Sequence, residues 1–412
     1  MKRLFVLLAC CAAIAMIVTF VPALAQDDGS ETLINFVRPL VTSSTASASS
    51  CFGGPVVSVP MDCFQFTDSK TSTARNLLIV GRSPFNRGKT TTQVNVMIVP
   101  VIVTIGASVF DPTAVDPCFG AGTQTTVSLL QNSPIFETVT YDGGAGVGHG
   151  AMMNGVNVGT TTYNDGFRRA EFWSFVGGSN YHTTFNVTVH AAISVNASTI
   201  GGGVTRGSGC TLQGALYLNP NGPGGDWDAF AQNAVANSLG ITATTFPIFL
   251  MRNVVWSLST PPTFVNCCVG GYHGAFGNVP GNVWTYSPFD FETSGHFGNS
   301  SDSAIAAHEV GDWLDDPIGT NPTPAWGNIG QVSGCQGNWE VGDPLSGTNF
   351  PSVAMPDGFT YNLQELAFFS WYYNGHTGAG SAPSIGAGGK FSNNGTFTGA
   401  SQACPPGGTF PN

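Results

Sequence analysis

The feature that most constrains this chain is the acidic stretch AAHEVGDWLDDP, residues 306–317. Charged residues make up only 9% of the chain, yet one histidine and four carboxylates fall here within nine positions. On a helix, His308 and Asp312 project from one face because they are four residues apart. Glu309 follows His308 directly and can face the same cavity. We therefore expect a helix over residues 301–314 that presents these three side chains together.

The spacing of these side chains indicates metal chemistry. Two ligands at positions i and i+4, with a glutamate between them, form the pattern of zinc-hydrolase helices. The second ligand is usually histidine, whereas this chain has Asp312. His308 and Asp312 are thus the predicted metal ligands. Glu309 is the predicted general base, which takes a proton from a metal-activated water.

A third metal ligand must come from another part of the chain. The preferred candidate is Asp343, which lies in the turn WEVGDP, residues 339–344. Further candidates are Glu340, Asp316 and His296. Two carboxylates and one imidazole form a harder ligand set than two imidazoles and one carboxylate, so calcium or manganese is an alternative to zinc. Without a metal, the same pattern fits a capped surface helix whose carboxylates are solvated.

The first residues and the overall charge restrict where the protein acts. Lys2 and Arg3 precede an apolar run over residues 4–20, and a small-residue cleavage site ends at Ala25, which is the pattern of a signal peptide over residues 1–25. We expect a secreted, periplasmic or extracellular protein that is free of the membrane after cleavage. The net charge of −11 argues against nucleic acid as a partner. The sequence leaves the oligomeric state open.

The cysteine content also fits export. Eight cysteines follow the signal, and an even number in an exported protein indicates disulfides. Plausible pairs are Cys51 with Cys63 and Cys335 with Cys404. The adjacent Cys267 and Cys268 are expected to bridge to different partners rather than to each other. The eight are Cys51, Cys63, Cys118, Cys210, Cys267, Cys268, Cys335 and Cys404.

The hydrophobic pattern predicts an α+β fold in one large domain. Residues 26–50 are polar and are expected to form a flexible N-terminal segment. Residues 51–412 form the predicted domain, with a β-rich part over 51–299 and the motif helix and C-terminal part over 300–412. Strands are predicted over 94–105, 183–195, 246–256 and 283–286, and helices over 126–136, 164–175, 227–239, 301–314 and 362–373.

Three local expectations accompany this prediction. Pro100 interrupts the strand over 94–105, which indicates an edge strand or a bulge. The strand over 283–286 is expected to hold an extended substrate by backbone pairing, as edge strands do. Arg168 and Arg169 are a rare pair of cations in an acidic chain and are expected to pair with Asp165 or another surface carboxylate, with binding of a substrate carboxylate as the alternative.

The motif region resembles that of a family of secreted proteins, which includes the plant phosphate-induced, exordium-type proteins and exported bacterial relatives. In that family HExxExxTDP is followed by a tryptophan and then by ExGD. The resemblance covers residues 300–345 and implies a zincin-like fold with a metal site near the helix. Asp312 replaces the family's glutamate, and Asp315 replaces its threonine. The matching residues are His308, Glu309, Asp312, Asp316, Pro317, Trp326, Glu340, Gly342 and Asp343.

These observations lead to one functional prediction and two alternatives. The prediction is an exported zincin-like metallohydrolase, a zinc peptidase acting on peptide or protein substrates. The first alternative is a non-catalytic cell-surface or glycan-binding protein on a degenerate zincin scaffold, which the aspartate at 312 favours. The second is a calcium-stabilised structural domain. It would use Asp312, Asp315, Asp316, Glu340 and Asp343.

Overall fold

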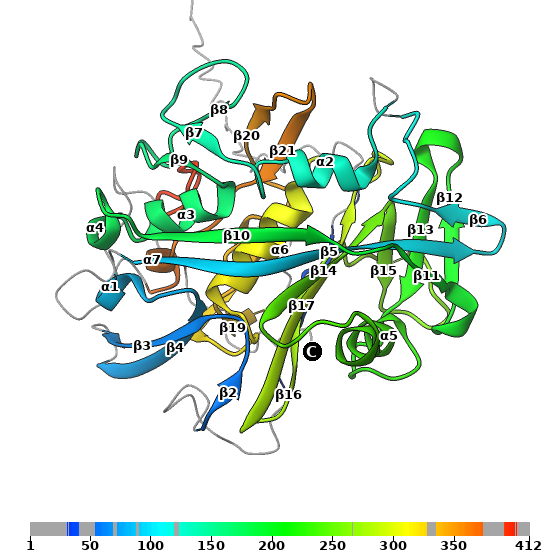
Figure 1. Ribbon diagram of the computed structural model, residues 1–412, viewed down its shortest axis with the longest axis horizontal. Coiled ribbons are helices and arrows are strands. Elements are labelled where there is room, and N and C mark those ends of the chain that lie inside the picture. Colours follow the sequence, from blue (N-terminus) through cyan, green and yellow to red (C-terminus); the bar gives the residue numbers. More distant parts are fainter. Residues whose placement is uncertain are drawn as a thin grey trace, which may run out of the picture. The chain divides into compact units, whose positions relative to one another are not determined.

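The largest structural element is a mixed sheet whose central strands run across the molecule (Figure 1). Its main strands lie in the order β1-β16-β17-β14-β5-β10, and β2, β6 and β11 pair at its margins. The strands are β1 (Val37–Arg38), β2 (Val56–Val57), β5 (Thr91–Ile105), β6 (Ser108–Phe110), β10 (His182–Val189), β11 (Ile193–Asn196), β14 (Thr245–Arg252), β16 (His273–Gly277) and β17 (Gly281–Phe291).

This structure, a computed structural model, describes residues 31, 33–40, 54–68, 72–87, 90–118, 123–265, 267–327, 335–373, 391–399 and 401. Residues Glu31–Asn412 form one compact unit. The predicted signal peptide, Cys51 and Cys404 lie outside the described residues. In the described part of the chain, no helix has the length and apolar character needed to cross a membrane.

Strand β5 is an interior strand of the sheet, and residues 98–101 in its middle are apolar and buried without interruption. It pairs in parallel with β10 on one side and with β14 on the other, and sheets covered on both faces require such continuous apolar runs. The prediction that Pro100 marks an edge strand or a bulge is therefore wrong. Pro100 is tolerated because pairing with β10 ends at Ile98 and pairing with β11 begins at Val101.

Strand β17 differs from the prediction in both length and position. It extends well beyond residues 283–286 and lies between β14 and β16, so it is not an edge strand. The edge beyond β16 is filled by β1, which pairs with it in parallel. Residues 33–40 are thus ordered against the sheet, which corrects the flexible N-terminal segment predicted over 26–50 for this part. The composition of this segment does not reveal its order, because the order depends on pairing with a strand far along the chain.

Smaller sheets surround the main one. Strand β15 follows β14 after a turn at Asn253, whose φ is 53°, so the single strand predicted over 246–256 is two strands. The remaining strands are β3 (Met61–Asp68), β4 (Thr73–Val80), β7 (Val139–Tyr141), β8 (His149–Gly150), β9 (Gly159–Thr161), β12 (Gly203–Arg206), β13 (Gln213–Tyr217), β15 (Val254–Ser257), β18 (Pro322–Gly327), β19 (Cys335–Asn338), β20 (Asn349–Ala354) and β21 (Thr360–Gln364).

Most of the predicted helices form. The exception is the helix predicted over 362–373, which is wrong because Thr360–Gln364 pairs with β20 in a hairpin and leaves only the short α7. The helices are α1 (Pro84–Arg87), α2 (Thr126–Asn132), α3 (Tyr163–Glu171), α4 (Trp173–Val176), α5 (Trp227–Asn233), α6 (Ala304–Asp315) and α7 (Phe369–Tyr372).

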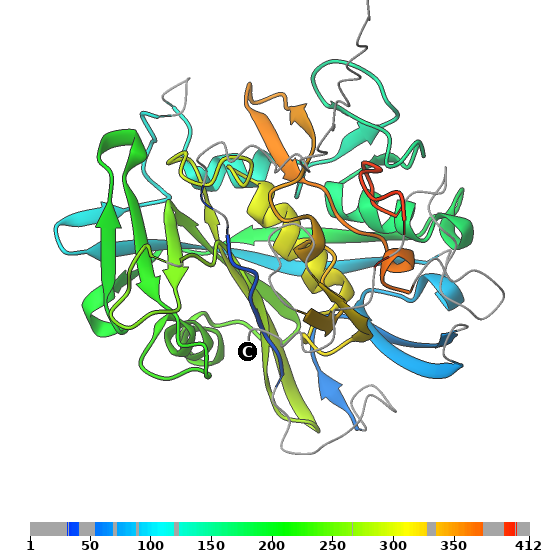
Figure 2. The same cartoon turned by 180° about the vertical axis from the view of Figure 1, so that it is seen from behind.

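Helix α6, the motif helix, packs across one face of the sheet (Figure 2). The indole of Trp313 stacks on the ring of Phe246 in β14, with the ring centroids 3.6 Å apart, and its Nε1 donates a hydrogen bond to Thr285 in β17. On its other side, Asn164 of α3 donates a hydrogen bond to the carbonyl oxygen of Ala307. The helix is buried throughout, so the prediction of a solvated surface helix is wrong.

Two disulfides are described completely. Cys118 bonds Cys210 across 92 residues, and Cys267 bonds its neighbour Cys268. The expectation that the adjacent cysteines bridge to different partners is therefore wrong. Cys63 and Cys335 are also disulfide-bonded. Their predicted pairing with Cys51 and Cys404 stays a prediction.

Candidate metal centre

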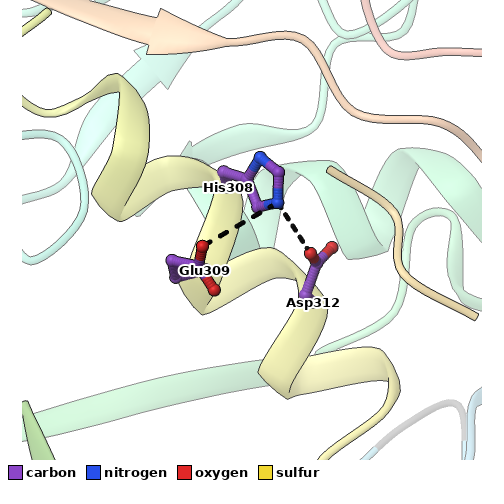
Figure 3. A group of neighbouring side chains, drawn as sticks. All are labelled: His308, Glu309 and Asp312. Carbon is purple, nitrogen blue, oxygen red and sulfur yellow. Dashed lines mark ion pairs between the residues drawn. The ribbon is translucent and has the colours of Figure 1, made fainter. Parts of the chain in front are cut away.

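The three motif side chains of α6 gather at one buried point (Figure 3). His308, Glu309 and Asp312 are 8%, 4% and 2% exposed. One nitrogen or oxygen atom from each lies within 4.8 Å of the others. The helix periodicity brings His308 and Asp312 together, as the sequence predicts, and Glu309 turns into the same space.

The third predicted ligand joins this point from a different segment. Asp343 begins a 3-10 turn (Asp343–Leu345) that follows the loop after β19. The His308 Nε2 atom lies 3.0 Å from Asp312 Oδ2 and 3.2 Å from Asp343 Oδ1. One carboxylate oxygen of each aspartate therefore faces the same nitrogen of His308. We call His308, Glu309, Asp312 and Asp343 the α6 cluster.

The orientation of the His308 ring is fixed from behind by Gln364 at the end of β21. The Gln364 side-chain nitrogen donates to the Gly342 carbonyl oxygen, so its oxygen faces His308 Nδ1 at 3.1 Å. His308 Nδ1 must then carry the proton, because an amide oxygen only accepts. In the neutral ring, Nε2 is left as the free ligand atom, aimed at the two aspartates.

Both aspartates are held in the same way, by a donor on the oxygen that does not face His308. The Gly342 N–H donates to Asp312 Oδ1, and Gln336 Nε2 donates to Asp343 Oδ2 at 2.7 Å. Gly342 also lies flat on the His308 ring, where an added Cβ would come within 2.5 Å of the ring. A glycine is therefore required at 342 for the loop to approach the helix so closely.

Glu309 differs from the other members of the cluster because its carboxylate has no fixed partner. Among the described residues, no group donates a hydrogen bond to it, and its closest ionic contact is His308 Nε2 at 3.9 Å. Burial raises its pKa well above the ordinary value for glutamate. Its side chain lines a small cavity of about 20 Å³, together with His308, Gln364 and residues 33–35. That volume holds about one water.

The electrostatics of the cluster call for a further positive charge. Burial alone lowers the pKa of His308, but Asp312 and Glu309 outweigh it and raise the pKa well above its usual value. Burial also raises the pKa of Asp312. In the described part of the chain, no lysine or arginine contacts the three carboxylates. A cation at the point of convergence would satisfy all of them at once.

The distances from His308 to the two aspartates fit a metal ion. Zinc binds histidine nitrogen and carboxylate oxygen at about 2.0–2.2 Å, so two ligands of one tetrahedral ion lie about 3.4 Å apart. The separations of 3.0 and 3.2 Å between His308 Nε2 and the two aspartates are close to this value. Asp312 reaches the site although it is one methylene shorter than the glutamate of the resembling family.

The other predicted candidates lie outside the cluster. Glu340 is buried and contacts His273 Nε2 at 2.9 Å. Asp316 accepts hydrogen bonds from the backbone N–H groups of Thr320 and Asn321 and so shapes the turn after α6. His296 is partly exposed and contacts the Thr211 carbonyl oxygen at 3.0 Å.

His273, at the start of β16, is a further histidine close enough to the cluster to interact electrostatically with Asp312 and His308. Burial lowers its pKa to about 4, while the charge of Asp312 opposes that shift and the charge of His308 adds to it. It is therefore neutral at ordinary pH and adds no positive charge to the cluster. Its Nε2 is occupied by the contact with Glu340.

Sequence reasoning missed three residues that position the cluster. Gln364 and Gln336 were not singled out, and Asn35, whose side chain donates to the Asp343 carbonyl oxygen at 3.1 Å, was assigned to the flexible segment. Each acts on α6 or on the 342–343 turn from a distant part of the chain. No local motif marks such residues.

The C-terminal end of α6 carries a separate buried ion pair. Arg168 of α3 lies 2.6 Å from Asp315, and it also donates to the carbonyl oxygens of Leu314 and Val80. Both side chains are fully buried, so the expected surface pairing of Arg168 is wrong. Asp315, which replaces the threonine of the resembling family, therefore serves to hold the helix end.

Comparison with known proteins adds no further assignment. No protein-family model matches the chain, and neither a curated protein nor a solved structure matches it. The resemblance to the exordium-type family and the zincin-like fold therefore stay predictions.

Proposed function

We propose that the protein is an exported metal-dependent hydrolase, and that its reaction is the cleavage of peptide bonds at the α6 cluster. The observation that carries this proposal is that an oxygen of Asp312 and an oxygen of Asp343 both face His308 Nε2, beside a glutamate that has no fixed partner. His308, Asp312 and Asp343 would hold the metal, with zinc as the preferred ion. The buried and oriented donor set supports this role.

The residues divide the chemistry as follows. A bound metal would act as a Lewis acid and lower the pKa of a water in the site. Glu309 takes a proton from that water while the water oxygen attacks the carbonyl carbon of the peptide. The C–N bond then breaks, and Glu309 passes the proton to the leaving nitrogen. The products are a carboxylate and an amine, so the reaction needs no further reactant.

The alternative of a glycan-binding protein has less support. Aromatic residues near the C-terminus form the cluster that an exposed sugar-binding surface would need. All are 0–2% exposed and pack in the core, so none is available to a ligand. They are Phe368, Phe369, Trp371, Tyr372 and Tyr373.

The test is hydrolysis of a mixture of unstructured peptides by the zinc-loaded protein, followed by mass spectrometry. Glu309→Gln should lower the rate by about 10²- to 10⁴-fold, because it removes the proton acceptor while preserving the side-chain shape. It should still bind zinc. Glu137→Gln, at an exposed glutamate, is the matched control and should keep full activity. Equal rates for Glu309→Gln and the wild type would contradict the proposal.

A further inference from the structure

A segment from the N-terminal part of the chain lies over the α6 cluster. Residues 33–38 run along the outer edge of β16, and Val37 and Arg38 pair in parallel with His273 and Gly274. The Ile34 N–H donates to the Cys268 carbonyl oxygen at 2.6 Å. Figure 2 shows this segment in dark blue, beside α6. It is bound as an extended peptide is bound by a sheet edge.

The floor under this segment is the sequence CCVGGYHG, residues 267–274. An added Cβ at Gly270 would come within 2.7 Å of the Leu33 side chain, and one at Gly271 would come within 2.8 Å of the Glu309 side chain. Side chains at these positions would therefore block either the segment or the glutamate. The two glycines give an extended backbone close access to Glu309 and leave room for the apolar side chain of Leu33.

Polar anchors fix the register of the segment. Arg38 lies 3.0 Å from Asp228, with 9% and 0% of the two side chains exposed. Asp228 also accepts a hydrogen bond from Tyr272 at 2.7 Å. Asn35 donates to the Asp343 carbonyl oxygen and accepts from Ser346 at 2.8 Å. The groove thus contains a built site for one apolar residue, one amide and one arginine.

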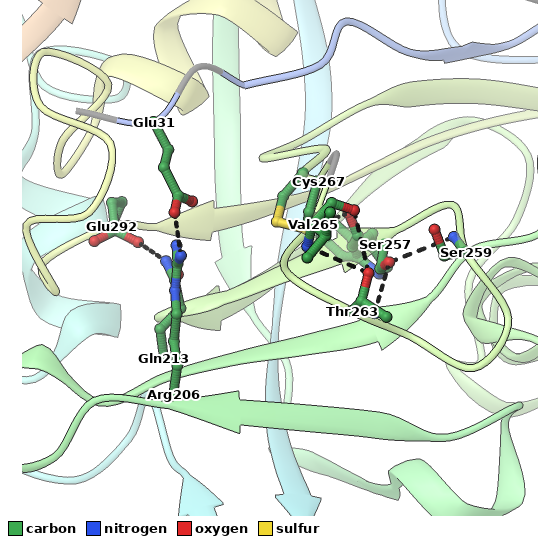
Figure 4. Close-up of a disulfide and its surroundings, with 11 residues drawn as sticks. Glu31, Arg206, Gln213, Ser257, Ser259, Thr263, Val265, Cys267 and Glu292 are labelled. Carbon is green, nitrogen blue, oxygen red and sulfur yellow. Dashed lines mark hydrogen bonds and ion pairs between the residues drawn. A yellow bond between two sulfur atoms is a disulfide. The ribbon is translucent and has the colours of Figure 1, made fainter. Parts of the chain in front are cut away.

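The segment is also tied beyond the groove. Glu31 forms an ion pair with Arg206 of β12 (Figure 4). The same view shows Cys267, the first residue of the floor, with its disulfide. With the segment in place, Glu309 lines a cavity of about 20 Å³ that is also lined by Leu33, Ile34 and Asn35. A peptide substrate cannot reach Glu309 until residues 33–38 leave.

We infer that this groove is the peptide-binding site and that residues 33–38 are its built-in competitor. The inference rests on the proposed function and specifies its substrate class. The substrate is an extended peptide with an apolar residue at the Leu33 position and an arginine five residues later. Asp228 recognises the arginine, and the two glycines of the floor accept the apolar residue.

The experiment releases the segment without truncating the folded chain. A recognition sequence for a site-specific protease is inserted within residues 41–50, and the protein is cut after it has folded. The mature chain has no cysteine before Cys51, so the cut fragment is free to exchange. The substitution Arg38→Ala in the cut protein weakens the binding of residues 33–38 to the groove. If the Arg38→Ala protein fails to fold, the Asn35→Ala protein takes its place in the experiment.

The first readout is binding, in a Glu309→Gln background. A fluorescent peptide with the sequence of residues 31–40, ETLINFVRPL, should bind the cut protein. The same peptide with alanine in place of the arginine should bind at least tenfold more weakly, and a scrambled peptide should not bind. No binding of the first peptide, or equal binding of the first two, would overturn the inference.

The second readout is hydrolysis, with Glu309 restored. The cut protein should cleave a quenched peptide with leucine and arginine in this spacing faster than the uncut wild type does. Binding without hydrolysis would support the groove as a peptide-binding site and refute the proposed function. Hydrolysis without binding of the peptide would support the proposed function and refute the assignment of the groove as the peptide-binding site.

Discussion

Helix α6 carries two buried groups of charge, and they are built in opposite ways. At its C-terminal end, Arg168 faces Asp315 at 2.6 Å, and its two terminal nitrogens also donate to the carbonyl oxygens of Val80 and Leu314. In its middle, three carboxylates surround the single imidazole of His308. The first group contains its own cation, whereas the second has an excess of negative charge.

The difference separates a structural ion pair from a binding site. A buried carboxylate without a cation is costly, and its pKa rises. Burial raises the pKa of Glu309 and of Asp312, and it also raises the pKa of Asp315 to about 6, so the two groups differ in their cations rather than in the direction of these pKa shifts. The donors on Asp312 and Asp343 come from the side away from His308, so they orient the oxygens without neutralising them. We propose that the Arg168 pair holds the helix and that the α6 cluster receives a cation.

The largest expected effect is on the structural side of this comparison. Arg168→Met leaves Asp315 buried without its partner and removes the donors to two carbonyl oxygens. It should lower the free energy of unfolding by about 3–5 kcal/mol, as the loss of one member of a buried pair does. Urea denaturation measures this loss. Arg82→Met, at an exposed arginine, is the control, and a similar small change in both variants would remove the distinction between the two groups.

A smaller effect is expected from the residue that orients His308. Gln364→Met fills the same space but cannot accept the His308 Nδ1 proton, so the ring loses its fixed direction. Metal affinity should fall about 10- to 100-fold, the usual cost of losing such a partner. Competition with a coloured zinc chelator measures the change. If affinity is unaltered while the fold is intact, Gln364 does not position the ligand.

The smallest effect concerns pH. In the metal-free protein, burial alone lowers the pKa of His308, but Asp312 and Glu309 raise it further than burial lowers it. The folded metal-free protein therefore keeps a proton on His308 at a pH where the unfolded chain has lost it, and the stability from this proton is lost as pH rises through the folded pKa. A metal must displace that proton.

Metal affinity should thus fall as pH is lowered, with proton release on binding near pH 7. Calorimetric titrations in two buffers of different ionisation enthalpy measure the released protons. The same titration of His273→Gln should release as many, because His273 is already neutral. Zinc binding with no proton release would show that His308 is not a ligand.

The sequence predicted the parts of this site that depend on local pattern. The i to i+4 spacing of His308 and Asp312 placed them on one face of α6, and the apolar run over 94–105 predicted a strand, although not its interior place in the sheet. Asp343 was preferred among the carboxylates of its turn, and the structure places it 3.2 Å from His308.

The rest depends on long-range pairing that no local pattern reveals. Residues 362–373 have the apolar spacing of a helix, but the hairpin with β20 takes the first part into a strand and so brings Gln364 to His308. Residues 33–38 are a second example. Their polar sequence neighbours predict a flexible segment, but pairing with β16 orders them. Arg168 is buried only because the end of α6 supplies its acceptors.

The measurement that tests the central claim most directly is the metal content of the purified protein by elemental analysis, for the wild type, His308→Ala and the control His190→Ala. The α6 cluster predicts about one zinc per chain in the wild type and in His190→Ala, and none in His308→Ala. The absence of stoichiometric metal from all three proteins after incubation with zinc, or equal metal in all three, would contradict the assignment of the cluster as a metal site.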